Sequence, residues 1–263
     1  MQPTDKYRRC IRCNHKFSST KSLCPSCHQW HTPEAEKIGD DTILLSDVSP
    51  APIHRLKTGP WDLCFGPEKP PYGVVSTSVS LLGGMPGAGK STLALQLCDI
   101  IASYTQREII YIGAEESPEQ MADRARRLEL ESLHMIRVFP MGSNADVVDT
   151  LMRYKPCAVI LDSLPGLVSD AEMGVTLCTR LKQFAIDLKA PFLVIDHVTK
   201  QDDFAGLMKL QHAVDTLITI YPDDEGIRTM TTIKNRFGPA NVSVELAMTT
   251  KGLVPFQESD DVH

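Results

Sequence analysis

The residues of this chain best suited to chemistry form a glycine-rich segment that ends in Lys90 and Ser91. The segment matches the pattern Gly-x-x-x-x-Gly-Lys-Ser and lies between a predicted strand and a predicted helix, the context that a phosphate-binding loop (P-loop) requires. Glycines let such a loop wrap a triphosphate, with N–H groups pointing inward beside a helix N-terminus. The predicted nucleotide-binding residues are Gly84, Met85, Pro86, Gly87, Ala88, Gly89, Lys90, Ser91 and Thr92.

Two side chains near this loop have the chemistry to hold Mg²⁺. A hydroxyl in the position of Ser91 binds the metal, while Lys90 reaches the β- and γ-phosphates. Asp162 ends the apolar strand 158–162, the form of a Walker B strand whose carboxylate completes the Mg²⁺ coordination directly or through a water. Many buried strands end in Asp, so it is the pairing with the loop that predicts ATP and Mg²⁺ as cofactors.

A pair of carboxylates, Glu115 and Glu116, follows the predicted strand 108–113. Hydrolysis needs a group near the γ-phosphate that orients or deprotonates the attacking water. The alternative is that both are helix N-terminal charges favoured by the helix dipole. Because Ser117 already caps that helix, we interpret the pair as catalytic, with Glu115 ahead of Glu116.

His197 follows the apolar strand 191–196. In a sheet that carries a P-loop, this strand end lies where a polar side chain can sense the γ-phosphate. A lone histidine at a strand end is more often structural, so the spacing alone leaves both interpretations open.

The first 27 residues contain two Cys-x-x-Cys pairs separated by ten residues. This spacing can place four thiolates around a tetrahedral zinc ion. A redox dithiol pair or two disulfides are alternatives, but neither pair precedes a helix in a βαβ unit. The four other cysteines are scattered and are expected to be small buried hydrophobes in a reducing compartment. The predicted zinc ligands are Cys10, Cys13, Cys24 and Cys27.

The elements that must position these residues alternate between short apolar strands and amphipathic helices, which predicts an α/β fold with a mostly parallel sheet covered on both faces. The predicted strands are 74–82, 108–113, 135–139, 157–162 and 191–196. The predicted helices are 90–104, one capped by Ser117, 145–154 and 173–189. After Asp215 the strands 216–221, 229–234 and 242–248 follow one another and predict an antiparallel extension.

Composition divides the chain into four predicted parts. They are a zinc ribbon at 1–31, a proline-rich linker at 32–72 that packs partly on the core, an ATPase domain at 73–257 and an acidic tail at 258–263. With 42% hydrophobic residues among 263, the chain can bury a core. Its opening residues lack the apolar region of a signal peptide and no apolar run is long enough for a membrane span, so we expect a cytoplasmic protein. The net charge of −6 means that nucleic acid could bind only through a local basic channel.

Together these pieces resemble the bacterial RadA (Sms) family of RecA/DnaB-like ATPases, from about Cys10 to Phe256. The motifs that carry the resemblance are the cysteine ribbon, the P-loop, 114–117 (Ala-Glu-Glu-Ser), 197–200 (His-Val-Thr-Lys) and 234–238 (Lys-Asn-Arg-Phe-Gly). It implies a RecA-like core that hydrolyses ATP as a DNA-dependent helicase motor. Such motors are hexameric rings that drive branch migration on single-stranded or branched DNA in homologous recombination and DNA repair.

The resemblance also implies residue roles. Glu115 would be the catalytic glutamate and His197 the γ-phosphate sensor, while Lys234 and Arg236 would be fingers that reach the ATP of a neighbouring subunit. Without the resemblance, the basic residues of 234–238 at a strand end would indicate only a solvated turn. A cation supplied in trans stabilises charge on the transferring phosphoryl group, and a head-to-tail interface gives a ring if it closes.

RadA has a further C-terminal domain of the Lon protease type, whereas this chain stops at His263. We therefore expect a short version that lacks this domain, from a bacterial cell or encoded by a virus of a bacterial host. The segments 163–174 and 201–209 would face a DNA channel, with Lys200, Lys209 and Arg180 as the nearby cations.

Two other functions fit the same motifs. One is a DnaB-type replicative helicase whose ribbon docks a primase or another replication partner. The other is a KaiC-like adaptor ATPase whose nucleotide state switches protein binding. In the RadA-like interpretation the ribbon would contact a recombination protein.

Overall fold

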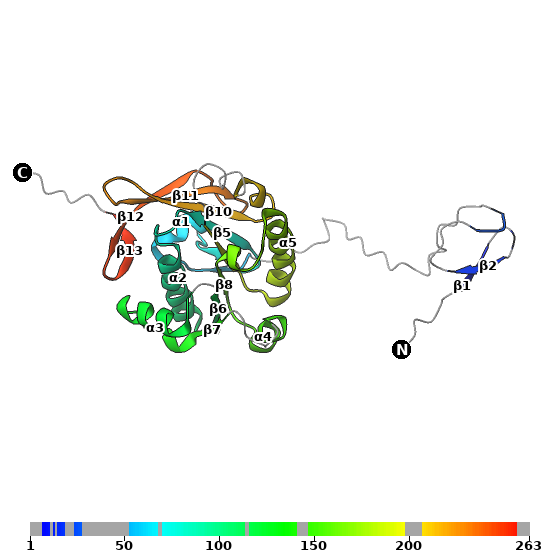
Figure 1. The fold of residues 1–263 in the computed structure, drawn as a ribbon, viewed down its shortest axis with the longest axis horizontal. Coiled ribbons are helices and arrows are strands. Elements are labelled where there is room, and N and C mark those ends of the chain that lie inside the picture. The colour runs from blue at the N-terminus through cyan, green and yellow to red at the C-terminus, as the bar shows by residue number, and fades with distance from the viewer. Residues whose placement is uncertain are drawn as a thin grey trace, which may run out of the picture. The chain divides into compact units, whose positions relative to one another are not determined.

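A computed structural model describes residues 7–10, 13, 15–18, 24–27, 53–67, 70–113, 116–140, 147–197 and 207–256 (Figure 1). They belong to two compact units, residues 1–52 and residues 53–263. Residues 53–67 and 70–72, from the C-terminal half of the predicted linker, are therefore part of the same unit as the P-loop.

The first unit is built on a short antiparallel hairpin. Strand β1 (Tyr7–Arg9) pairs with strand β2 (Lys16–Ser18), and the Cys10 N–H donates to the His15 carbonyl at 2.8 Å. Cys10, Phe17 and Cys24 are buried together, with Cys27 packed against them. A core this small is typical of domains that depend on a metal for stability.

The second unit contains a nine-stranded sheet in the order β13-β12-β11-β10-β5-β9-β8-β6-β7 (Figure 1). Every neighbouring pair from β10 to β7 is parallel, and β10 to β13 are joined in antiparallel fashion. This topology confirms the predicted α/β fold with a mostly parallel sheet and an antiparallel extension. The strands are β5 Val79–Gly84, β6 Ile109–Gly113, β7 Ile136–Pro140, β8 Val159–Asp162, β9 Phe192–His197, β10 Thr216–Pro222, β11 Arg228–Asn235, β12 Val242–Thr249 and β13 Gly252–Pro255.

Helices cover both faces of the sheet. On one face, α1 and α2 pack against strand residues such as Leu82 and Ile195. On the other face, α4 and α5 pack against the preceding residue of each strand, Leu81 and Val194. Because both faces are buried, the central strands consist mostly of apolar residues, such as Val-Ile-Leu in β8 and Phe-Leu-Val-Ile in β9. The helices are α1 Asp62–Phe65, α2 Lys90–Thr105, α3 Pro118–Arg127, α4 Val147–Tyr154 and α5 Ala171–Leu188. None of the described helices is both long and apolar enough to cross a membrane.

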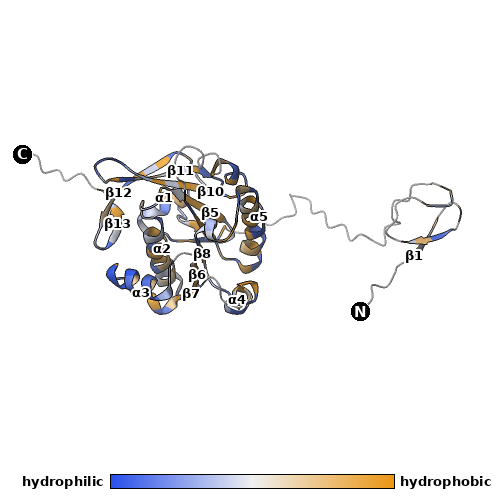
Figure 2. Ribbon diagram, viewed as in Figure 1, coloured by the Kyte–Doolittle hydropathy of each residue, from blue (hydrophilic) through white to orange (hydrophobic). Residues whose placement is uncertain are grey.

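Helix α3 begins where the sequence predicts. The Ser117 hydroxyl accepts the Gln120 N–H at 3.3 Å, and the Gln120 side chain accepts the Ser117 N–H at 3.0 Å, which completes a capping box. The helix is largely hydrophilic (Figure 2) and buries Met121 and Ala125. This cap fixes the start of the helix next to the end of β6.

The structure divides the predicted strand 74–82 into two. Residues Val74–Val75 form β4, which pairs with β3 (Arg55–Leu56) in a separate small sheet, and only Val79–Gly84 joins the large sheet. The Ser78 hydroxyl and N–H both donate to the Val75 carbonyl, at 2.7 and 3.1 Å, and this turn separates the strands. The structure also adds β13, which the sequence analysis did not predict.

Candidate functional site

Several of the predicted nucleotide-site residues lie at the edge of the sheet that is formed by the carboxyl ends of its parallel strands. Parallel pairing aligns Gly84 of β5 with His197 of β9, and Gly113 of β6 with Asp162 of β8. The carboxyl ends of these strands therefore lie together, which is where open α/β sheets bind ligands. The start of the P-loop, Asp162 and His197 share this edge.

The P-loop has the backbone that its glycines were expected to allow. Gly87 and Gly89 have φ angles of +79° and +103°, in the left-handed region that favours glycine. A Cβ on Gly84 would lie 2.3 Å from the Ile220 carbonyl oxygen of β10, so only glycine fits there. Met85, Pro86 and Gly87 are exposed, which leaves the turn accessible from solvent.

Lys90 lies inside the curve of this loop. Its residue surface is 3% exposed, and its Nζ donates to the carbonyls of Gly84 at 2.7 Å and Met85 at 2.9 Å. Ser91 and Thr92 continue the first turn of α2 and are partly exposed. The positive end of the helix and the Lys90 ammonium thus face the same small region, an arrangement suited to phosphate.

Asp162 has a partner that the sequence analysis missed. The hydroxyl of Tyr111, on β6, donates to Asp162 Oδ2 at 2.5 Å, and Tyr111 is 1% exposed. Burial, and then the charge of Asp162, raise the pKa of Tyr111 well above its ordinary value, so the phenol stays a proton donor. The only sequence cue was a single tyrosine in the otherwise aliphatic strand 109–112.

The two predicted catalytic carboxylates have different outcomes. Glu115 lies outside the described residues. Glu116 precedes the capped helix α3 and forms an ion pair with Arg124 of that helix, in which both side chains are partly buried. His197, at the end of β9, is partly exposed beside Gly84.

Lys234 and Arg236 lie near the amino ends of the parallel strands, at the edge of the sheet opposite to the P-loop. The Arg236 N–H donates to the Asp215 carbonyl at 3.0 Å, and the Asp215 N–H donates to the carbonyl of Val79, the first residue of β5, at 2.8 Å. Lys234 Nζ donates to the carbonyls of Gln211 and Val214 at 2.7 and 2.8 Å. Burial, and then the charge of nearby Lys182, lower the pKa of Lys234.

The turn that carries these two cations, residues 234–238, packs against the segment before β4. A Cβ on Gly238 would lie 2.1 Å from the Gly66 carbonyl oxygen, and Asn235 Nδ2 donates to the same oxygen at 3.3 Å. Arg55 donates to the Phe237 carbonyl at 3.1 Å. The turn is therefore held from its own chain on more than one side.

The four predicted zinc ligands come together in the first unit. Cys10 Sγ lies 3.5 Å from Cys27 Sγ, Cys13 Sγ lies 3.6 Å from Cys24 Sγ, and all four sulfurs are within 4.8 Å of one another. The Cys13 N–H points to Cys10 Sγ at 3.4 Å. By contrast, burial raises the pKa of the Cys64 and Cys178 thiols in the second unit to about 11, which suits inert core residues.

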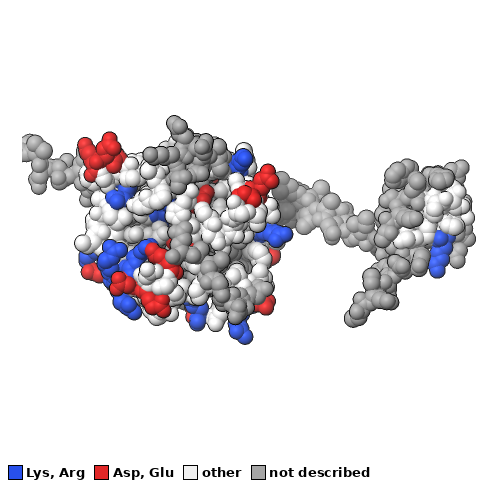
Figure 3. Space-filling model, in the orientation of Figure 1, with Lys and Arg blue, Asp and Glu red and all other residues white. Residues whose placement is uncertain are grey.

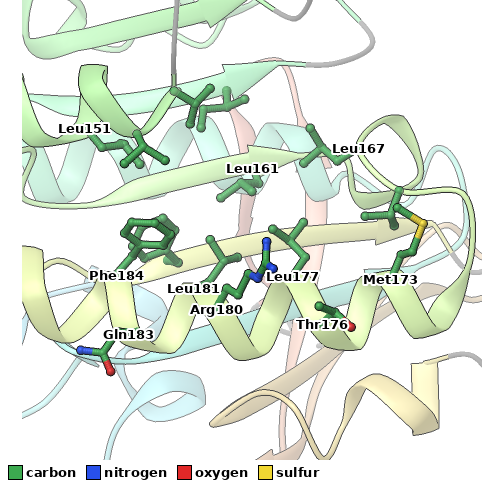
Figure 4. Close-up of a pocket in the computed structure, with 15 residues that line it drawn as sticks. Leu151, Leu161, Leu167, Met173, Thr176, Leu177, Arg180, Leu181, Gln183 and Phe184 are labelled. Atoms are coloured by element: carbon green, nitrogen blue, oxygen red, sulfur yellow. The ribbon is translucent and has the colours of Figure 1, made fainter. Parts of the chain in front are cut away.

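An apolar cavity of about 830 Å³ lies on the face of the sheet opposite to α2, between α4 and α5 (Figure 4). Leu177, Leu181 and Phe184 point from α5 toward the strands, while Gln183 points away. The lining offers few polar groups and no glycine-rich backbone, so the cavity does not suit a triphosphate.

Charges on the described surface are mixed. On the face drawn in Figure 3, basic and acidic side chains are interspersed. Of the cations predicted near a DNA channel, Arg180 and Lys209 are exposed, and Lys200 lies outside the described residues.

Comparisons with known proteins identify the family of the chain. A model of the AAA domain family matches residues 71–203, just over half of the chain. Proteins named DNA repair protein RadA from Chlamydia muridarum, Pseudomonas aeruginosa and Escherichia coli are each 30% identical to the chain over 93% of its length. The chain spans 57% to 58% of the length of these relatives. The matches confirm the resemblance to bacterial RadA, and the chain belongs to the AAA domain family.

Proposed function

We propose that this chain is a DNA-dependent ATPase of the RadA type, a motor that acts on single-stranded or branched DNA in recombination and repair. Ring assembly, helicase activity and branch migration belong to the proposal. The RadA-named relatives and the two separated halves of the site support it. A localisation in the cytoplasm follows from the same proposal.

In this function the P-loop residues hold ATP. Lys90 contacts the β- and γ-phosphates, and the amides of the loop cradle the phosphate oxygens at the start of α2. The glycines suit this role because Gly87 and Gly89 adopt the positive φ angles of the loop, and Gly84 leaves room for the Ile220 carbonyl behind it. His197 senses the γ-phosphate from the adjacent strand.

Ser91 and Asp162 are the residues that would hold Mg²⁺, and the donor set of a hydroxyl and a carboxylate fits this cation. When bound, Mg²⁺ neutralises charge on the phosphate oxygens. Tyr111 fixes the Asp162 carboxylate by its short hydrogen bond. Glu115 is proposed to orient the attacking water. The Arg124 ion pair gives Glu116 a different partner and favours Glu115 for this task.

The observation that carries the proposal is the distance between the two halves of the site. Arg236 is tied through Asp215 to Val79, at the start of β5, and the P-loop begins at Gly84, at its end. The five residue steps from Val79 to Gly84 span roughly 16 Å along the strand. Arg236 is therefore too far to act on the ATP of its own chain, so a cation from this turn would serve a neighbouring subunit in a head-to-tail assembly.

The function is tested by ATP hydrolysis with and without single-stranded DNA, at low and moderate salt, with the particle size measured in the same samples. Stimulation that fades with salt in a ring-sized species is the expected result, because phosphate contacts release counterions. Activity on branched substrates would then distinguish RadA-type migration from DnaB-type strand displacement. A monomer whose ATPase rate does not change when DNA is added would contradict the proposed motor function and favour a KaiC-like adaptor.

Zinc binding by the ribbon is a separate prediction. Tetrahedral zinc–thiolate bonds of about 2.3 Å place the sulfurs about 3.8 Å apart, close to the spacing observed here. The wild-type chain should carry about one zinc ion, and the double variant Cys13→Ser, Cys24→Ser should carry almost none by elemental analysis. Cys178→Ala, at a buried position in the core, is the matched control and should keep its zinc. Equal zinc content in all three proteins would contradict the assignment.

Tyr111→Phe tests the positioning of Asp162. Phe fills the same buried space but cannot hold the carboxylate, so the Mg²⁺ concentration for half-maximal ATPase should rise about tenfold, the size expected for a lost hydrogen bond to a charged group. Tyr104→Phe, at a tyrosine that is 53% exposed on α2, is the control. An unchanged Mg²⁺ dependence in Tyr111→Phe would show that the hydrogen bond does not matter for metal binding.

A further inference from the structure

Asp215 is a buried carboxylate that links β5 to the turn 234–238. Its side chain is 5% exposed. Asp215 Oδ2 accepts the Val79 N–H at 3.0 Å, and the Asp215 N–H donates to the Val79 carbonyl at 2.8 Å. The residue is therefore fixed at the first residue of the strand that leads to the P-loop.

The other carboxylate oxygen of Asp215 holds two cations. Oδ1 lies 3.1 Å from Arg236 Nη1 and 3.2 Å from Lys182 Nζ of α5. The Arg236 N–H also donates to the Asp215 carbonyl at 3.0 Å. One buried residue thus holds both the backbone and the guanidinium of Arg236.

Arg236 is held at one end and remains accessible at the other. Its side chain is 66% exposed, although the carboxylate that it contacts is buried. A guanidinium has five N–H donors in a rigid fork, so a single bond through Nη1 leaves donors that can meet a phosphate. The contact with Asp215 restricts the rotamers of the Arg236 side chain, which lowers the conformational entropy lost when its guanidinium binds a phosphate.

The local charge balance favours an incoming anion. Lys182 and Arg236 pair with the carboxylate of Asp215, and the pKa of nearby Lys234 is lowered by burial and in part by these two cations. Asp215 pairs with Lys182 and Arg236, and one carboxylate cannot neutralise all three cations. The surplus positive charge remains available for an incoming phosphate.

We propose that Asp215 is a positioning residue for the trans finger: it holds the Arg236 guanidinium in the orientation that meets the γ-phosphate on a neighbouring subunit. This inference rests on the proposed role of Arg236. It assigns to Asp215 an effect on turnover that passes through Arg236 and does not require contact between Asp215 and ATP.

The test is a double-mutant cycle in the full chain, with Asp215→Asn, Arg236→Ala and the double variant, measured by kcat and KM for ATP. Asp215→Asn should lower kcat on the order of 10-fold to 100-fold, the loss expected when a charge-assisted hydrogen bond is removed, with KM nearly unchanged. In the Arg236→Ala background the same change should have almost no further effect, because the group that Asp215 positions is gone.

Asp99→Asn is the matched control. Asp99, on α2, accepts the Ser132 N–H at 2.6 Å, so this variant also loses a carboxylate that accepts a backbone N–H, but away from the turn 234–238. It should leave kcat within about twofold. If Asp215→Asn does not assemble, Asp215→Glu keeps the charge, moves the carboxylate by one methylene and is measured in the same cycle.

The outcomes separate the two ideas. If Arg236→Ala hydrolyses ATP at the wild-type rate, the assignment of Arg236 as a trans finger is wrong. If Arg236→Ala is impaired but the effect of the Asp215 variant is absent, or multiplies with that of Arg236→Ala, Asp215 does not act through Arg236 and the inference is overturned. A lowered kcat that is lost in the Arg236→Ala background, in particles of wild-type size, is the supporting result.

Discussion

Lys90→Ala should lower the ATPase kcat by about 100-fold to 1,000-fold, the range found when one preorganised donor to a developing negative charge is removed. In the structure Lys90 is 3% exposed, and its ammonium donates to the carbonyls of Gly84 and Met85. Lys90 is the only Lys or Arg among residues 84–92. The measurement is steady-state hydrolysis at saturating ATP and Mg²⁺.

The fold of the Lys90→Ala chain should be retained. The loop residues 85–87 are exposed, so water can replace the ammonium as a partner for at least the Met85 carbonyl. The melting temperature should therefore stay near that of the wild type, and Lys57→Ala, at an exposed lysine of the same unit, should be unaffected in both rate and stability. A Lys90→Ala chain that hydrolyses ATP normally would remove the P-loop from the mechanism.

The parts of the site that could be predicted from sequence are those encoded within a few consecutive residues. The P-loop predicts its own surroundings, since a strand must precede Gly84 and a helix must follow Lys90. The capping box at Ser117 similarly depends on residues three positions apart. Asp162 and His197 could be placed at the same edge because the ends of neighbouring parallel strands meet there.

The parts that could not be predicted depend on register and on backbone partners. The hydroxyl of Tyr111 reaches Asp162 only because β6 pairs with β8 so that Gly113 lies opposite Asp162. Lys234 is held by the carbonyls of Gln211 and Val214, and carbonyls carry no residue-specific signature. The division of 74–82 was equally hidden, because apolar residues flank a short polar turn that a continuous strand could also contain.

The cis contacts of Arg236 change what its substitution should do. Because Asp215 and the packed turn hold the finger from its own chain, Arg236→Ala removes a group that is already oriented, and should leave the subunit fold and the nucleotide affinity of its own P-loop intact. The expected loss in kcat is about 1,000-fold, the lower end of the range for arginine fingers supplied in trans. Arg153→Ala, at an exposed arginine of α4, is the matched control.

Mixing the two inactive chains gives the sharpest measurement. An Arg236→Ala chain has an intact P-loop and a Lys90→Ala chain has an intact finger, so an interface between them in the correct order contains both. In a random equal mixture of head-to-tail assemblies, roughly a quarter of the interfaces are complete, and about a quarter of the wild-type rate should return. A site that used its own Arg236 would recover nothing on mixing, because no single chain carries both groups. The recovered rate therefore reports directly whether the opposite edges of two sheets meet to form one active site.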